Sequence, residues 1–337
     1  MTWHWKPRVT VLAVVLLALA GCGDRAGTES AVGEPFDPQF HLEQRLAIGG
    51  EDTFGRISDL IADERGHIYV LDVYFKKLDR FDASGAQVAT LGREGEGPGE
   101  FSYPRALAFW GGADLLVFDQ RNLRLTEVAT EDDALSLVKE ARVPLSPFEI
   151  CTLSGRIFTL GLFEGHVVHE LSPAGEIIAS FGEPYSDDPI IQDIASFGHL
   201  LCDEATATIL VVPAMFPQVR AFEPSGELRW AVELADYNQT VYERSGVTVR
   251  PRPHESGRTH SAAGVVAAGP DVALVQLRLR SAEPEAPVEI ESRFLSLADG
   301  TEIARRSDLP QLMYVRETVA YATVEDPYPR VLVFDMR

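Results

Sequence analysis

The chain has 337 residues and an acidic composition, with 51 Asp and Glu against 30 Lys and Arg and a formal net charge of −21. A surface of this sign repels phosphate backbones, so nucleic acid is not an expected partner. With 45% hydrophobic residues the chain can bury a large core, and one closed β domain is ordinary for this length.

The first residues have the features of a targeting segment. Lys6 and Arg8 precede an apolar run, Val9 to Ala20, that is too short to span a bilayer as a stable helix. The run ends in Leu19-Ala20-Gly21-Cys22, which resembles the lipobox of bacterial lipoproteins. The resemblance implies a signal peptide over residues 1–21, cleavage before Cys22 and lipid attachment at Cys22. An ordinary signal peptide with a chance cysteine is the alternative.

A lipid anchor would place the protein at a membrane of the cell envelope. Gly23 follows the cysteine, and the sorting rule of lipoproteins then favours the outer membrane if the cell has one. The expected location is therefore the periplasmic side or the outer membrane. Residues 22–40 contain few large apolar side chains and several Gly, Pro, Ser and charged residues, which predicts a disordered tether. The folded domain is then expected over residues 41–337.

The most informative pattern recurs about every 45 residues. It is clearest after residue 66, where alternating stretches at 68–72, 78–81 and 87–91 are separated by turns and followed by a glycine-rich loop. Alternation with a period of two indicates half-buried antiparallel strands. A chain that repeats such a β-meander is a solenoid or a propeller.

The turns after the third strand of each repeat allow the repeats to be counted. They are rich in the Gly, Asp, Ser and Pro residues that tight hairpins require, and lie at 82–85, 130–133, 172–175, 223–226 and 297–300. A sixth repeat ends with a third strand at 330–335 and lacks a fourth. The segment from His41 to Ile48 supplies one, and closing the ring in this way hides the sheet edges. We therefore predict an all-β, six-bladed β-propeller of four-stranded antiparallel blades.

Residues 60–125 resemble NHL-type six-bladed propellers. The stretch from Leu91 to Phe101, with Pro104, is similar to the NHL inter-blade loop, and residues 119–125 are similar to the Asp…Asn…Arg segment after the second strand. The later repeats keep the period and lose most of these residues. The resemblance extends to the NHL-like or TolB-like propellers found among bacterial lipoproteins, and it implies the same fold.

No motif of the sequence predicts catalysis or a cofactor. The loop from Arg93 to Glu100 is glycine-rich but lacks the Gly-Lys-Ser/Thr of a phosphate-binding loop, so its glycines are expected to form turns. Asp72 and Asp119 each end a second strand, where a carboxylate accepts backbone N–H bonds or, alternatively, binds a metal in the central channel. The histidines occupy different phases of the repeat, which does not favour a His-metal centre. The expected cofactor is none, with a divalent metal as the alternative.

Cys151 and Cys202 are the remaining cysteines after Cys22, and both are expected on innermost strands of neighbouring blades. An exported pair forms either a disulfide or two buried reduced thiols. Their positions in the repeat differ by about one residue, so the sequence leaves both alternatives open.

The candidate binding surface is the face that carries the second-to-third strand turns and the loops between blades. The region 237–260 interrupts the repeat there with a cluster of arginines, as a docking arm or as a solvated insertion. Mixed aromatic and cationic groups suit an anionic or aromatic partner. The candidate residues are Phe75, Lys77, Arg93, Arg121, Asn122, His166, Phe216, Arg250 and Arg252.

The sequence therefore predicts a lipid-anchored envelope propeller that acts as a binding module for a protein, peptide or glycan; it favours a non-enzymatic role without deciding the question. The alternative is a metal-dependent hydrolase or lyase, of the lactonase or amidating-lyase kind, with its site on the propeller axis.

Overall fold

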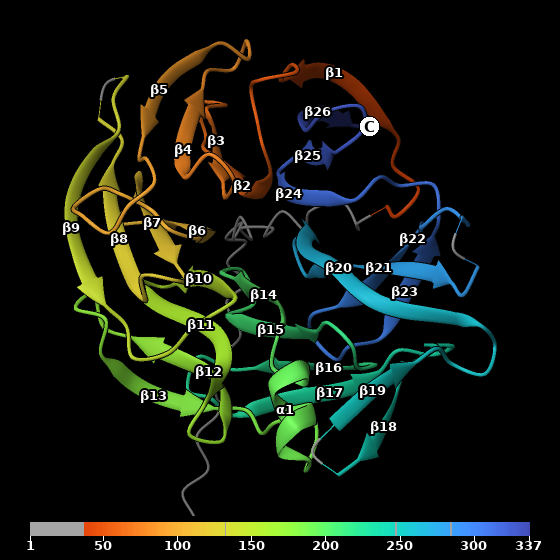
Figure 1. Ribbon diagram of the computed structural model, residues 1–337. Coiled ribbons are helices and arrows are strands. Elements are labelled where there is room, and N and C mark those ends of the chain that lie inside the picture. The colour runs from red at the N-terminus through yellow and green to blue at the C-terminus, as the bar shows by residue number, and fades with distance from the viewer. Residues whose placement is uncertain (1–36, 132, 247, 284) are drawn as a thin grey trace, which may run out of the picture. The chain divides into compact units, whose positions relative to one another are not determined.

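The computed structural model describes residues 37–131, 133–246, 248–283 and 285–337. The predicted signal segment, Cys22 and the tether up to residue 36 lie outside the described residues. The described part forms six four-stranded antiparallel sheets placed around a common axis (Figure 1). The predicted fold, an all-β six-bladed propeller, is confirmed.

The six blades follow one another along the chain, each running from the axis outwards. Blade I contains β2 (Ile57–Ala62), β3 (Ile68–Asp72), β4 (Lys77–Phe81) and β5 (Gln87–Leu91). Blade II contains β6 (Pro104–Trp110), β7 (Asp114–Asp119), β8 (Arg124–Ala129) and β9 (Ser136–Arg142). Blade III contains β10 (Glu149–Leu153), β11 (Arg156–Phe163), β12 (His166–Leu171) and β13 (Ile177–Phe181).

The second half of the ring has the same order with longer strands in one blade. Blade IV contains β14 (Gly198–Asp203), β15 (Thr208–Pro213), β16 (Gln218–Phe222) and β17 (Leu228–Glu233). Blade V contains β20 (Arg258–Gly269), β21 (Val272–Ser281), β22 (Glu289–Ser296) and β23 (Glu302–Arg306). Blade VI contains β24 (Leu312–Arg316), β25 (Val319–Val324), β26 (Arg330–Met336) and, from the other end of the domain, β1 (Leu42–Ile48).

The pairing of β1 with β26 closes the ring. The two strands are antiparallel, and Ile48 lies opposite Val331 while Leu42 lies opposite Met336. This is the closure predicted from the missing fourth strand. The innermost strands then neighbour one another all the way round, from β2 through β6, β10, β14, β20 and β24 back to β2.

The core consists of six apolar layers, each between two neighbouring blades. The layer between blades VI and I contains Ile48, Phe54 and Leu60, all less than 5% exposed. In the layer between blades I and II, Phe101 is fully buried, as expected for the residue that ends the glycine-rich loop. The closing strand β1 contributes side chains to two layers, the one between blades V and VI and the one between blades VI and I. It therefore contacts both blades that neighbour blade VI.

The residues immediately before β1 also join the core. Phe40, expected at the end of the tether, is 7% exposed and packs edge-on against Phe294 of blade V with 6.0 Å between ring centroids. Arg306 donates hydrogen bonds to the carbonyls of Pro38 and Phe40, at 2.9 and 2.7 Å. The domain therefore already has ordered contacts at Pro38.

Two elements interrupt the propeller pattern near blade IV. The short helix α1 (Pro189–Ala195) precedes the blade and is capped by Asp188, which accepts a hydrogen bond from the Ile190 amide at 2.9 Å. A separate hairpin, β18 (Val241–Ser245) and β19 (Thr248–Arg252), follows the blade. No helix within the described ranges has the length and apolarity needed to cross a membrane.

Candidate functional site

The propeller axis contains a cavity of about 660 Å³ that all six blades line. Residues of the six innermost strands form most of its walls, and its mouth includes Val73 from the β3–β4 turn and Glu325 from the turn after β25. The cavity thus opens on the face that holds the second-to-third strand turns. This is the face that the sequence analysis selected.

Four of the six innermost strands contain a β-bulge that lies against the cavity. The pairing shifts by one residue at Ser58 in β2, Arg105 in β6, Ala263 in β20 and Met313 in β24. All four residues line the cavity. A bulge redirects a side chain out of the regular alternation and is frequent beside functional sites. The cavity wall is therefore shaped by the backbone as well as by side-chain choice.

Asp59 is a carboxyl group deep in this cavity. Its two oxygens accept backbone hydrogen bonds from Leu60 at 2.8 Å and from Leu107 in the next blade at 2.7 Å. Burial and then the charge of Glu149 raise the pKa of Asp59 to about 8, against the opposing effects of these N–H groups and of Arg105. Asp59 is therefore mostly protonated at neutral pH and does not add negative charge to the cavity.

Glu149 and His199 join the innermost strands of blades III and IV. The His199 Nδ1 atom lies 3.1 Å from a carboxylate oxygen of Glu149. On the same two strands, Cys151 and Cys202 form a disulfide with their Cα atoms 5.7 Å apart. All four side chains line the cavity, so its wall is cross-linked at this seam both covalently and by a polar contact.

Three arginines line the cavity or its mouth, and each donates to a neutral acceptor. Arg56 donates to the Tyr103 hydroxyl at 2.9 Å, and Arg105 donates to the Phe148 carbonyl at 3.4 Å. Arg278 donates to the Gln311 side-chain oxygen at 2.7 Å. Burial lowers the pKa of Arg278, but at neutral pH the guanidinium of an arginine keeps its charge.

Asp72 and Asp119, the two carboxylates that end second strands, anchor the loops that lead to the axis. Both are fully buried. Asp72 accepts hydrogen bonds from the amides of residues 55, 56, 74 and 75. Asp119 accepts them from the amides of Ser102 at 2.6 Å and Tyr103 at 2.9 Å. Their role in the structure is therefore the backbone-binding one, which places Arg56 and Tyr103 at the cavity mouth.

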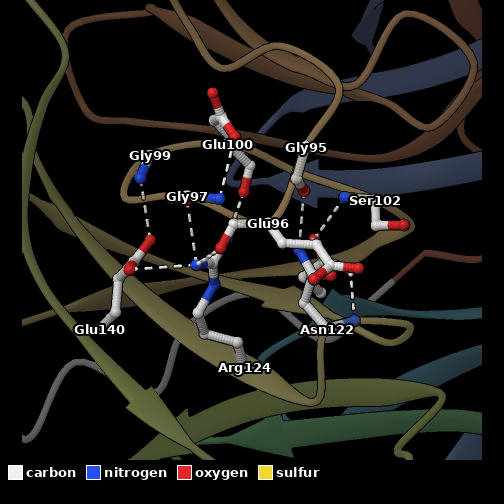
Figure 2. A network of polar contacts seen from close by, with 10 residues as sticks. Gly95, Glu96, Gly97, Gly99, Glu100, Ser102, Asn122, Arg124 and Glu140 are labelled. Carbon is white, nitrogen blue, oxygen red and sulfur yellow. Dashed lines mark hydrogen bonds and ion pairs between the residues drawn. The ribbon is translucent and has the colours of Figure 1, made fainter.

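The glycine-rich loop is held by a network that Figure 2 shows from close by. The Asn122 side chain donates to the Gly95 carbonyl at 3.1 Å and to Asp119 at 2.9 Å. Arg124 donates to the carbonyls of Glu96, Gly97 and Glu100 and pairs with Glu140 at 3.1 Å. Asn122 and Arg124 therefore hold the glycine-rich loop in place. The residues of 119–125 that resemble the NHL segment have this structural role.

The candidate residues chosen from the sequence lie around the cavity and not in it. Phe75 is 40% exposed in the β3–β4 turn, with the Lys77 ammonium 5.4 Å from its ring centre. Lys77 also pairs with Asp79 at 2.8 Å, and Arg93 pairs with Glu100 at 2.7 Å. Arg121 is exposed in the β7–β8 turn, and His166 begins β12 beside the Glu164 carbonyl at 3.2 Å. The structure does not gather these side chains into one cluster.

The predicted docking arm is the β18–β19 hairpin. Arg252 pairs with Glu243 across it at 2.7 Å, and Arg244 pairs with Asp188. Its Tyr242 stacks on Phe216, which also stacks on Tyr185, with ring centroids 6.3 and 6.1 Å apart. Carboxylates therefore compensate part of the basic charge, and an aromatic stack fixes the hairpin to blade IV. Arg250 lies on its exposed edge.

Asp59, Arg105, Glu149 and Arg278 were not predicted as cavity residues, and His199 was considered only as one of several histidines. For Asp59, Arg105 and Glu149 the available signal was a charged residue within a largely apolar innermost strand. Within the ranges that the structure describes, no group of three or more His, Cys, Asp or Glu side chains is arranged to hold a metal ion.

The comparisons with known proteins identify the fold. No family model and no curated protein sequence matches the chain. A member of the DUF4221 family from Bacteroides vulgatus is similar with a TM-score of 0.58 at 9% identity, covering 88% of this chain and 98% of that one. A putative exported protein from Bacteroides fragilis gives 0.55 at 11% identity, with coverages of 88% and 95%.

An enzyme is also among the similar structures. Virginiamycin B lyase from Staphylococcus aureus gives a TM-score of 0.50 at 9% identity, covering 88% of this chain and 99% of that one. At such identities the likeness establishes a shared propeller architecture and nothing finer. The chain is accordingly a six-bladed β-propeller, similar in fold to a putative exported protein and to a lyase.

Proposed function

We propose that this protein is a lipid-anchored binding module of the cell envelope that recognises a protein, peptide or glycan at the cavity-bearing face. The observation that carries the proposal is the axial cavity, to which all six blades contribute polar or charged groups. A rigid ring holds these groups without a conformational change, which suits static recognition. The exposed turns around the mouth, including Phe75, Arg121 and Arg250, would extend the contact surface.

The location rests on the leader. The resemblance of residues 19–22 to a lipobox supports an anchor at Cys22, and the putative exported protein from Bacteroides fragilis has the same architecture. An NHL-like or TolB-like propeller of a bacterial lipoprotein accounts for both features. Cys22→Ser should release the protein from the membrane fraction, and a variant that stays fully membrane-bound would contradict the anchor.

The binding face can be tested by photo-crosslinking in intact cells. A crosslinking amino acid at Arg121, in the β7–β8 turn, should give a defined product. The same group at Ala174, exposed in the β12–β13 turn of blade III, is the matched control because third-to-fourth strand turns lie on the opposite face of the ring. Products of equal yield from both positions, or no product from Arg121, would refute the assignment of the face.

A hydrolase or lyase is the second candidate function. One observation favours it: Asp59, whose pKa is raised, and the Glu149–His199 pair share one cavity, as acid and base groups do in active sites. The shared architecture with a lyase is consistent with this reading. Elemental analysis of the purified protein that finds about one divalent ion per chain would favour the metal-dependent form of this enzyme.

A further inference from the structure

The arginines of the axial cavity differ in their partners from several other buried or half-buried arginines of this chain. Arg293, Arg306 and Arg124 each pair with a carboxylate. Within the described ranges, neither Arg105 nor Arg278 forms an ion pair; each reaches only a neutral oxygen. In a chain with 51 acidic residues a carboxylate partner is easy to supply. Two half-buried guanidinium groups without one therefore indicate a place for an anion from outside.

The two arginines lie on opposite sides of the cavity. Arg105 is on β6 in blade II, and Arg278 is on β21 in blade V. Two blades lie between them in either direction around a ring of six. A single small anion cannot contact both, whereas an elongated ligand with a charge at each end can.

The carboxylates of the cavity offset this positive charge only in part. Glu149 contacts His199 at 3.1 Å. The charge of Glu325, which is exposed at the mouth, acts on Arg278, but within the described ranges the two form no ion pair. Burial raises the pKa of Asp59 to about 8, while the charges of Glu149 and Arg105 act on Asp59 in opposite directions, so this carboxyl is mostly neutral at pH 7. It can therefore donate a hydrogen bond to an anion.

Part of the remaining wall is apolar, and Ser58, Thr152 and Thr323 also line it. Leu107, Phe109, Val265 and Met313 line the cavity between the polar groups. Its volume of about 660 Å³ lies within the range of sites that enclose drug-sized molecules. An inorganic anion would leave most of this surface in contact with water, while a hydrocarbon chain would cover it.

We propose that the axial cavity binds an organic dianion, with one carboxylate at Arg105, the other at Arg278 and an apolar spacer across the axis. This inference rests on the proposed binding function and names the class of ligand for it. Arg56, hydrogen-bonded to Tyr103 at the mouth, would attract the ligand by its charge. The ligand is either a free dicarboxylic acid or the end of a larger molecule with the same two groups.

Titration calorimetry on the full-length protein in detergent tests the proposal. The probes are linear dicarboxylates from succinate to sebacate, with hexanoate and octanoate as monocarboxylates and inorganic sulfate as a plain anion. A dicarboxylate of one preferred length should bind at least about tenfold more tightly than the monocarboxylate of equal length. Arg105→Gln and Arg278→Gln should each remove this advantage, which corresponds to a loss of about 10 to 100-fold.

Arg280→Gln is the matched control, because Arg280 is exposed two residues further along β21 and outside the cavity. It should leave the affinity within about twofold. Circular dichroism checks that each variant is folded, and either arginine variant suffices if the other does not fold. A further probe is an acetylated acidic dipeptide, used with a free and with an amidated C-terminus. Binding of the form with the free C-terminus would indicate that the cavity accepts the end of a larger molecule, and no binding of either form would indicate a free dicarboxylic acid.

Three results would overturn the inference: equal binding of mono- and dicarboxylates, affinity unchanged in both cavity variants, or no binding by any probe. None of them affects the crosslinking result at Arg121, which judges the proposed binding face separately. A crosslink with no dicarboxylate binding would thus reject the ligand class and keep the binding face.

Discussion

Replacing Ile48 with alanine tests whether β1 is a structural member of the ring. Ile48 is 4% exposed, lies opposite Val331 and packs in the layer between blades VI and I. The substitution removes three carbon atoms, which at about 0.8 kcal/mol each amounts to about 2.4 kcal/mol of lost burial. The cavity that remains adds to this, so the expected loss of unfolding free energy is about 3 to 4 kcal/mol.

The assay is urea unfolding followed by tryptophan fluorescence and, independently, by far-ultraviolet circular dichroism. The control is Gln44→Ala on the same strand, where the side chain is exposed and the expected change is within about 0.5 kcal/mol. If residues 41–48 were part of a tether, both substitutions would be neutral. A change below about 1 kcal/mol for Ile48→Ala would therefore refute the structural role of β1.

Three further predictions concern groups close to the axis. Replacing Cys151 and Cys202 with serine should lower the free energy of unfolding by about 4 kcal/mol by the loop-entropy relation, since the disulfide closes a loop with a sequence separation of 51. An unfolding midpoint of the unmodified protein that is the same with and without reductant would contradict the disulfide. Asp119→Ala should destabilise by about 3 kcal/mol or more, because it leaves buried amides unpaired, while Asp82→Ala, in an exposed turn, should cost far less. Asp59 has a raised pKa in the folded state, so the native protein keeps a proton that the unfolded chain loses above about pH 4. Its contribution to stability should therefore fall by up to about 1.4 kcal/mol per pH unit towards pH 8 and then level off. Thermal unfolding of Asp59→Asn from pH 5 to 9 should lack this slope, and an unchanged slope would exclude Asp59 as its source.

The architecture was predictable from local signals. Five of the six blades end their third strand with a turn rich in Gly, Asp, Ser or Pro, and such residues determine hairpins through their own backbone preferences. The missing last strand and the strand-like segment 41–48 then allowed only one closure that leaves no open edge, and the pairing of β1 with β26 confirms it. These features depend on short-range chemistry, which a sequence displays directly.

The side chains that line the axis were not predictable in the same way. The bulges at Ser58, Arg105 and Met313 shift the alternation within the innermost strands, so a period of two does not tell which residues face the cavity. The β18–β19 hairpin was likewise read only as an irregular region, because its docking depends on long-range stacking of Tyr242 on Phe216. Tertiary contacts of this kind leave no periodic trace in the sequence.

The position of a bound ligand in a crystal structure is the most direct test of the proposed binding site in the axial cavity. Crystals grown with a bromine-substituted form of the preferred dicarboxylate should show one anomalous peak inside the ring, with carboxylates contacting Arg105 and Arg278. Crystals of Arg278→Gln under the same conditions should lose it. An anomalous peak confined to the outer surface, or a peak in the cavity that persists unchanged in Arg278→Gln, would contradict the claim that the opposed arginines form the binding site.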